Sequence, residues 1–219
     1  DDQAGTHGTG LGLNGAPDND VILALPANAP RMPRNRFAEW LGRAILRAGG
    51  WRMVGALPDI PKAVLIAAPH SSNWDGLWGF AAKLGMGVKL SILGKDSLLR
   101  IPVLGSLLRW QGVIPVDRSA PHGVVDQAAE AIRNADRMWY AIAPEGTRKW
   151  VDRWKPGFWH IASRAGVPVI PAYFDYASKV IGIGPPFVPG TDMRADIARI
   201  QRWYKPHRGR NHDVVQPAD

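Results

Sequence analysis

The sequence predicts one α/β domain with a largely parallel central sheet flanked by helices, preceded by an N-terminal amphipathic helix. Short aliphatic runs alternate with helical patterns between residues 63 and 174, and this alternation is typical of parallel sheets, in which helices connect successive strands. Polar and charged residues directly follow four of the aliphatic runs. The length of 219 residues suits one domain with a substantial core.

The composition excludes several kinds of site and points to an anionic partner. The chain has no cysteine, which excludes disulfides, thiol nucleophiles and cysteine-ligated metals. Residues 1–30 contain four aspartates and no Lys or Arg, so residues 31–219 carry 27 basic and 15 acidic side chains, a formal charge of +12. With ten tryptophans, so basic a body fits nucleic acid, a phosphorylated substrate or an anionic membrane surface. No uncharged apolar run approaches the roughly 18 residues that span a bilayer.

Residues 1–30 are expected to form a flexible tail. They are rich in Gly, Asn, Asp, Ala and Pro and show no sustained periodicity, a composition that buries little apolar surface. They lack the basic start and apolar core of a secretory signal. Only the run Val21–Leu25 has the apolar character needed to pack on the body of the domain.

Residues 31–52 form the next predicted region, a basic amphipathic helix that stops at Gly49 and Gly50. Apolar residues recur there at helical spacings, at Phe37, Trp40, Leu41, Ala44, Ile45 and Ala48. Arginines between these positions supply the positive charge. Two interpretations stay open: the apolar face covers the core, or it lies at a membrane interface, where aromatic rings and arginines meet the headgroups.

Residues 53–219 are assigned to the α/β domain itself. Aliphatic runs predict strands at Ala63–Pro69, Val88–Leu93, Gly112–Val116, Met138–Ala143 and Val167–Phe174. Helical spacings of apolar residues predict helices at Asp75–Lys83, Leu98–Leu108, His122–Ala135 and Gly157–Arg164.

The polar residues that follow the predicted strands are expected to meet at one edge of the sheet. They are His70, Lys95, Arg118 and the run from Glu145 to Arg148. The carboxyl ends of parallel strands lie together, and ligands of α/β sheets bind there. One rim would therefore gather an imidazole and three cations, as a site for an anionic substrate requires.

His70 and Asp75 fit the roles of a general base and the group that orients it. The predicted strand–loop–helix boundary can bring the Asp75 carboxylate to one imidazole nitrogen while the other faces a substrate. Histidine, with an ordinary pKa of about 6.5, accepts a proton from a hydroxyl near neutral pH, and a carboxylate fixes its tautomer. On spacing alone the alternative stays open and is the more common case, in which Asp75 only starts a helix and His70 is an ordinary loop residue.

Four sequence blocks together resemble the glycerolipid acyltransferase family, which includes the lysophosphatidic acid acyltransferases. The blocks are HSSNWD at 70–75, GVIPVDR at 112–118, APEGTR at 143–148 and VPVIPAY at 167–173. The first is that family's His-x4-Asp motif, and the third its Pro-Glu-Gly-Thr-Arg motif. Two departures stand beside the third block, where Ala143 replaces a common Phe and Lys149 a common Ser. The compact frame resembles the short bacterial members.

The resemblance implies transfer of an acyl group from acyl-CoA or acyl-ACP to the hydroxyl of a lysophosphatidic acid-like acceptor, in phospholipid biosynthesis. His70 would be the base and Asp75 its orienter, with no acyl-enzyme, no metal and no cofactor beyond the thioester co-substrate. The residues that match the acceptor-binding blocks, or lie between them as a further cation, are Lys95, Arg118, Glu145, Gly146, Thr147 and Arg148. Arginine grips phosphate with parallel donors, whereas Glu145 is expected to hold an arginine or the loop.

The expected partners are therefore an anionic membrane surface, a lysophospholipid and a thioester carrier, with no nucleic acid. The protein would lie at the cytoplasmic face of the cell membrane as a peripheral protein. Two other functions remain to be weighed. One is a non-enzymatic module that binds anionic lipid or nucleic acid, and the other is a hydrolase that uses Ser71 or Ser72 beside His70.

Overall fold

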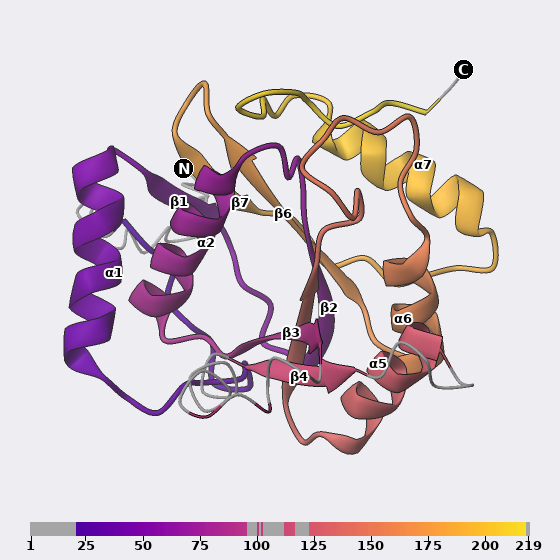
Figure 1. Cartoon of the computed structure of the whole chain (residues 1–219), viewed down its shortest axis with the longest axis horizontal. Helices are drawn as coiled ribbons and strands as arrows, with labels where there is room; N and C mark the ends of the chain where they lie inside the picture. Colours follow the sequence, from indigo (N-terminus) through magenta and orange to yellow (C-terminus); the bar gives the residue numbers. More distant parts are fainter. Residues whose placement is uncertain (1–20, 96–99, 101, 103–111, 117–122, 218–219) are drawn as a thin grey trace, which may run out of the picture.

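The central sheet has the order β1-β7-β6-β2-β5-β3-β4 (Figure 1). The structure is a computed structural model, and it describes residues 21–95, 100, 102, 112–116 and 123–217. The strands are β1 (Arg52–Gly55), β2 (Lys62–Ala67), β3 (Leu90–Lys95), β4 (Val113–Val116), β5 (Met138–Ile142), β6 (Val169–Asp175) and β7 (Val180–Ile183). All neighbours pair in parallel except β6 with β7. The predicted α/β class with a largely parallel sheet is confirmed.

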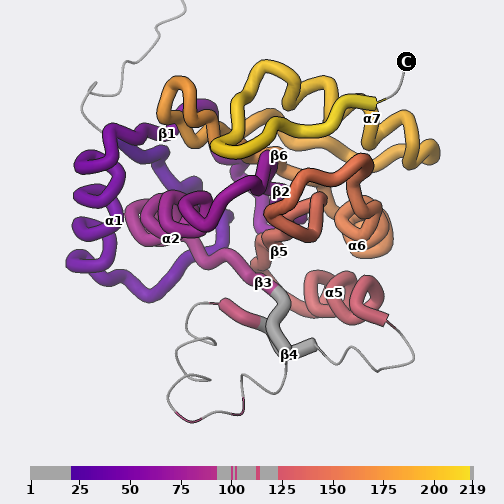
Figure 2. The backbone as a smooth tube through the Cα atoms, turned by 45° about the horizontal axis from the view of Figure 1, so that its top comes forward, coloured from indigo at the N-terminus to yellow at the C-terminus, as the bar shows by residue number. Residues whose placement is uncertain are grey.

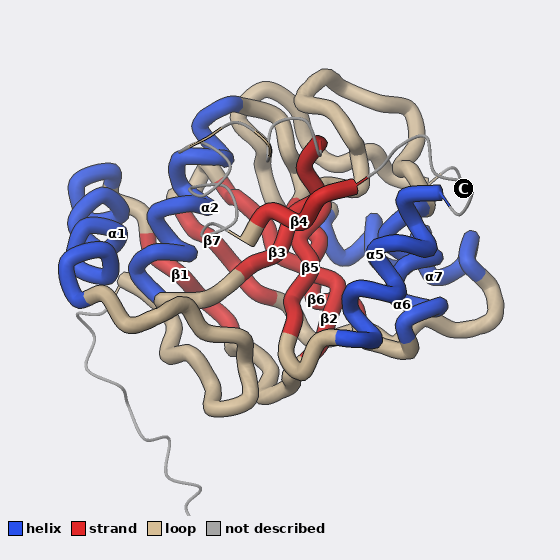
Figure 3. Tube along the Cα trace, turned by 60° about the horizontal axis from the view of Figure 1, so that its bottom comes forward, coloured by secondary structure: helices blue, strands red, loops and turns tan. Residues whose placement is uncertain are grey.

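Helices cover both faces of this sheet (Figure 3). Helices α1 (Arg36–Gly49) and α2 (Asn73–Met86) lie on one face, and α5 (Gly123–Asn134), α6 (Gly157–Ala165) and α7 (Met193–Tyr204) on the other. Strand β2 shows why two cores form, because successive side chains point to opposite faces. Ala63 and Leu65 pack toward α1 and α2, whereas Val64 and Ile66 pack toward α5, α6 and α7.

A capping box begins helix α2 at the end of the loop after β2. The Ser72 side chain accepts from the Trp74 amide at 3.2 Å, and the Asp75 carboxylate accepts from the Ser72 amide at 2.9 Å. This reciprocal pair satisfies amides that have no partner in the first turn. The helix therefore starts two residues before the predicted Asp75 and fixes the loop that carries His70.

Helix α1 packs on α2 through a face that the apolar pattern did not predict. The face is built from Gly42 and the buried Leu46, and a Cβ on Gly42 would lie 2.4 Å from the carbonyl oxygen of Ala81. The glycine thus lets the two helices approach closely. Phe37 and Trp40, on the far side of α1, stack on each other at 5.8 Å and are 68% and 58% exposed.

The expected tail of residues 1–30 is too long at its C-terminal end. Residues 1–20 lie outside the described part of the chain, but Val21–Pro30 packs on the domain. Ala29 is fully buried, Ile22 joins the core beside α1, and the Met53 amide donates to the Val21 carbonyl at 2.9 Å. The Asn28 amide also donates to the Asp59 carboxylate at 2.7 Å. These bonds tie the segment to the body although its composition suggests a loose chain.

Three elements were not predicted by the sequence patterns: β1, and in the C-terminal third β7 and α7. Strands β1 and β7 have only four residues each, and α7 follows a proline- and glycine-rich stretch. The predicted helical segment at 98–108 lies outside the described residues apart from positions 100 and 102. The remaining predicted strands and helices correspond to β2 to β6, α2, α5 and α6 with shifts of a few residues.

Candidate active site

His70 and Asp75 meet at the carboxyl edge of the sheet. His70 follows the central strand β2 by three residues, and its Nδ1 lies 3.4 Å from Oδ2 of Asp75 in the first turn of α2. The His70 side chain is 29% exposed, whereas that of Asp75 is fully buried. This geometry leaves Nε2 of His70 as the nitrogen available to a substrate.

Asp75 is held as a carboxylate by donors on both of its oxygens. The amides of Ser71 and Ser72 donate to Oδ2 at 2.8 and 2.9 Å, and the hydroxyl of Tyr176 donates to Oδ1 at 2.5 Å. Burial by itself opposes ionisation, but the His70 imidazole, the Tyr176 hydroxyl and the Ser72 amide outweigh it and lower the pKa of Asp75. The capping box and the His70 contact therefore use the same side chain.

Glu145 supports the same loop from the end of β5. Its Oε2 accepts a 2.7 Å hydrogen bond from the His70 backbone amide, and the side chain is almost fully buried. Burial raises the pKa of the Glu145 carboxyl, against the lowering effects of the His70 amide and of the charges on His212 and His70. Its Oε1 has no hydrogen-bond partner among the described residues. Among the described residues, Glu145 thus contacts the loop and no arginine.

The turn after Glu145 brings several polar groups to the surface beside the dyad. Gly146 has a φ of +67°, and a Cβ there would lie 3.0 Å from the Lys155 side chain, so glycine suits this position on both grounds. The Thr147 hydroxyl accepts from the Lys149 amide at 3.2 Å and so closes the turn. Arg148 is exposed, and its guanidinium donates to no other described residue.

Two predicted cations cannot be placed with the others. Arg118 lies outside the described residues. Lys95 is the last residue of β3, paired in register with Val116 of β4, but its side chain also lies outside the described part. The structure therefore brings together His70, Asp75, Glu145 and the turn up to Arg148, all at one edge of the sheet.

Neither serine beside His70 is arranged as a nucleophile. Ser71 is 1% exposed, and its Oγ accepts from the amides of Arg210 and Asn211 at 3.0 and 3.2 Å. Ser72 caps α2 through its own side chain. Both hydroxyls serve the loop structure, which argues against the hydrolase interpretation.

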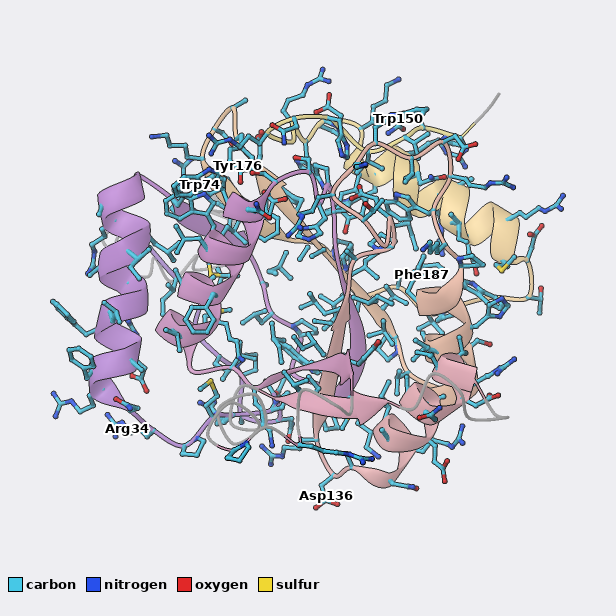
Figure 4. The ribbon with its side chains drawn as sticks, in the orientation of Figure 1. Arg34, Trp74, Asp136, Trp150, Tyr176 and Phe187 are labelled. Atoms are coloured by element: carbon cyan, nitrogen blue, oxygen red, sulfur yellow. The ribbon has the colours of Figure 1, made fainter. Side chains whose placement is uncertain are left out.

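The sequence patterns missed the residues that the last third of the chain contributes to the site. Tyr176 follows β6 directly and binds Asp75, and a turn near the C-terminus binds Ser71. Figure 4 shows Tyr176 and Trp74 close to each other where α2 begins. The one available signal was position, because Tyr176 follows a predicted strand as His70 and Glu145 do.

A cavity of about 500 Å³ opens beside the dyad between α2 and the sheet. His70 and Asp75 line it together with mainly apolar groups from α2, β2, β3 and β6, among them Gly76, Phe80, Lys83, Leu65, Ile92 and Phe174. The lining runs from Asp75 to Met86, which is about 16 Å of helix at 1.5 Å per residue. The arrangement can hold an extended apolar chain against a general base.

No helix in the described part of the chain combines the length and the apolar character needed to cross a bilayer. The same residues contain no group of three or more His, Cys, Asp or Glu side chains placed to hold a metal ion.

Comparisons with known proteins agree in pointing to one family. The sequence model of the acyltransferase family matches residues 54–175. A 1-acyl-sn-glycerol-3-phosphate acyltransferase of Haemophilus influenzae is 30% identical over 143 residues, covering 61% of this chain and 58% of that protein. The Escherichia coli protein of the same name is 33% identical over 122 residues, covering 53% of this chain and 48% of that protein. The chain thus spans roughly half of these relatives.

One solved structure shares the fold. The 1-acyl-sn-glycerophosphate (LPA) acyltransferase of Thermotoga maritima superimposes with a TM-score of 0.54 at 19% identity, over 80% of this chain and 81% of that chain. At this identity the likeness concerns the fold alone. It extends beyond the residues of the family match.

Proposed function

We propose, from the premise that this chain belongs to the acyltransferase family of glycerolipid enzymes, that it transfers an acyl group from a thioester to a lysophosphatidic acid-like acceptor. The observation that carries the proposal is the contact of His70 Nδ1 with a buried, hydrogen-bonded Asp75 beside an apolar cavity. A general base, a carboxylate that orients it and room for an acyl chain are three features that support this reaction.

His70 acts as the base in this scheme. Its Nε2 takes the proton of the acceptor hydroxyl as the oxygen attacks the thioester carbonyl, and a new C–O bond forms. The tetrahedral intermediate then collapses, the C–S bond breaks, and the leaving thiolate takes the proton from the imidazolium. The serines of the loop are committed elsewhere, which supports direct transfer without an acyl-enzyme.

Asp75 stabilises the imidazolium that forms during this proton transfer. A carboxylate with a lowered pKa stays ionised at neutral pH, so it holds Nδ1–H toward itself and keeps Nε2 free to act as base. Tyr176 and the two serine amides fix the carboxylate, and Glu145 fixes the loop. These residues position the base and do not touch the reacting atoms.

The acceptor phosphate is assigned to the exposed turn after Glu145. Arg148 offers a planar guanidinium whose donors are not engaged by other described residues, and Lys155 lies against Gly146. Arginine donors pair with phosphate oxygens in parallel. Arg118 and Lys95 complete this set by their likeness to the family pattern, together with Thr147.

The acyl chain is assigned to the cavity that runs along α2. Its lining is mostly aliphatic and aromatic, and the dyad lies at the N-terminal end of that helix. An acyl group whose carbonyl lies at His70 would therefore extend toward Lys83 and Met86. Burial of apolar carbon at about 25 cal/mol per Å² provides the binding energy for the chain.

An anionic membrane is the proposed partner surface. Large apolar side chains are exposed on the α1–α2 side of the molecule, at Phe37, Trp40, Trp74, Leu77 and Phe80. Exposed arginines, Arg34 and Arg36, lie at the start of α1. Aromatic residues beside arginines suit an interface with anionic headgroups, and Phe80 of this set also lines the cavity assigned to the acyl chain.

The proposal is tested by incubating the protein with an acyl-CoA and vesicles that contain lysophosphatidic acid, and by identifying the lipid product by mass. We expect phosphatidic acid from the native protein and a loss of at least about a hundredfold in His70→Ala, within the range that general base catalysis contributes. An active His70→Ala variant would refute the role of His70. Vesicle binding without any product would instead favour a non-enzymatic lipid-binding module.

A further inference from the structure

A turn near the C-terminus, Arg208–Asp213, lies across the loop that carries His70 (Figure 2). We refer to it as the C-terminal turn. It is closed by Asp213, whose carboxylate accepts from Nη1 of Arg208 at 2.5 Å and from the Gly209 amide at 2.9 Å. The turn lies well beyond residue 175, where the family match ends, so the family pattern assigns it no role.

The C-terminal turn is built onto the catalytic loop by specific hydrogen bonds. The amides of Arg210 and Asn211 donate to Ser71 Oγ, and the Asn211 side-chain amide donates to the Ser71 carbonyl at 2.6 Å. A Cβ on Gly209 would lie 2.0 Å from the His212 carbonyl oxygen, so this position requires glycine. The turn is therefore a fixed part of the site.

The same turn also reaches the loop after β5. Nε2 of His212 lies 3.1 Å from the backbone carbonyl oxygen of Arg148. The segment thus bridges the two loops that hold His70 and Glu145. The backbone of the C-terminal turn therefore has a defined position relative to both of these loops.

Arg210 is an exposed side chain of this turn. Its guanidinium lies over the ring of Trp74 at 5.2 Å and near the ring of Tyr176 at 5.9 Å. Trp74 precedes Asp75 in the chain, and the Tyr176 hydroxyl binds Asp75. The guanidinium therefore lies beside the His70–Asp75 pair, although Arg210 follows Ser71 by 139 residues in the sequence.

The two rings hold the guanidinium without using its donors. Cation–π contacts engage the flat faces of an arginine, whereas its N–H groups point outward in the plane. No described residue accepts a hydrogen bond from the Arg210 guanidinium. A planar set of free N–H donors, fixed beside a reaction site, matches the oxygens of a phosphate group.

We propose that Arg210 binds a phosphate group of a substrate, which makes the C-terminal turn part of the substrate site. The inference rests on the proposed acyl transfer. Two substrates could supply the group: the phosphomonoester of the acceptor lipid and the phosphates of a coenzyme A thioester. Both offer the same chemistry to a guanidinium, and kinetics with each substrate varied in turn distinguish them.

The test compares Arg210→Gln with Arg202→Gln, an exposed arginine of α7 whose replacement changes the net charge equally. Because Arg210→Gln removes charge-assisted hydrogen bonds to the phosphate, it should raise KM for one substrate about tenfold or more, with kcat within about twofold. Arg202→Gln should match the native enzyme. The substrate whose KM rises identifies the phosphate. Unchanged KM values for both substrates would overturn the proposal.

A binding measurement separates this proposal from the reaction itself. Calorimetric titration of the protein with a short-chain lysophosphatidic acid, and separately with coenzyme A, needs no turnover. Weaker binding of either ligand to Arg210→Gln would support the phosphate contact even if the native protein transferred no acyl group, and equal binding of both would refute it. The substitution leaves the turn in place, because the bonds to Ser71 come from backbone amides and from Asn211.

Discussion

The Tyr176 hydroxyl lies 2.5 Å from Oδ1 of Asp75, although the two residues are 101 positions apart in the chain. The contact completes the hydrogen bonding of a buried carboxylate whose other oxygen is occupied by loop amides. Burial and the bond to Asp75 both raise the pKa of the Tyr176 phenol, so it remains a neutral donor. The His70–Asp75 pair is thus connected to the end of β6 as well as to α2.

Tyr176→Phe should therefore lower kcat about tenfold and leave both KM values nearly unchanged. The expectation follows from the cost of about 1–3 kcal/mol for a buried acceptor left without its donor. Tyr173→Phe is the matched control, because the Tyr173 hydroxyl donates to no described residue. If Tyr176 acts through Asp75, its replacement should have little further effect in an Asp75→Asn background. Additive losses in the double variant would contradict this coupling.

Gly76 offers a way to obstruct the cavity without disturbing the core. It lines the cavity on α2, and a Cβ there would meet no heavy atom within 4 Å. Gly76→Leu should reduce kcat/KM for long-chain thioesters about tenfold or more while sparing short-chain donors. Gly76→Ala is the control, since it should stabilise the helix by up to about 1 kcal/mol. Equal losses for short and long chains would exclude the cavity as the acyl site.

Lys83 should make folding stability depend on pH in the alkaline range. Burial lowers the pKa of its ammonium from 10.5 to about 8. Between these two values the folded protein has released a proton that the unfolded chain still holds, so stability rises with pH over that window. The difference amounts to about 3 kcal/mol at most.

Lys83→Met should abolish this rise, because the variant has no ammonium to titrate at this position. Denaturant unfolding at pH 7 and pH 10 measures the rise in the variant against that in the native protein. An identical pH dependence in the two proteins would show that the Lys83 ammonium is not destabilised by burial.

Phe37 and Trp40 should contribute to membrane binding and little to folding. Together they expose a stacked aromatic pair on the outer side of α1. Changing both to Ser should weaken binding to anionic vesicles about tenfold or more, since each ring contributes on the order of 1.5–3 kcal/mol when buried. Val188→Ser, at a residue that is 73% exposed, should bind vesicles as the native protein does. A large loss of thermal stability in the double variant would instead assign the pair to the core.

The sequence predicted the positions of the strands along the chain better than it predicted which side chains are buried. The alternating pattern around β2 and β5 was strong enough to locate His70 and Glu145 at one edge. On α1, by contrast, the apolar pattern left open whether Phe37 and Trp40 face the core or a membrane, and the structure exposes both side chains. The contact between α1 and α2 depends on Gly42, which allows a close approach because it has no side chain. A pattern of apolar side chains does not identify such a residue.

The site residues that the sequence patterns did not predict were missed for a different reason. Tyr176 contacts the loop at 70–75 from the end of β6. The C-terminal turn contacts the same loop only after the chain has passed through β7 and α7. Neither lies in a motif, and the four-residue strands β1 and β7 are too short for a reliable periodicity. Contacts over more than a hundred residues follow from topology, which local spacing does not encode.

The position of β1 bears on how the chain assembles. Among the described residues, β1 pairs only with β7, which ends the chain's run of strands some 130 residues later. As the polypeptide leaves the ribosome, β1 therefore waits for its neighbour until nearly the whole domain has been synthesised. Pairing over so long a separation slows folding, and it leaves a strand edge exposed on the nascent chain. A fragment that stops at residue 175 would keep the His-x4-Asp motif and never close this edge.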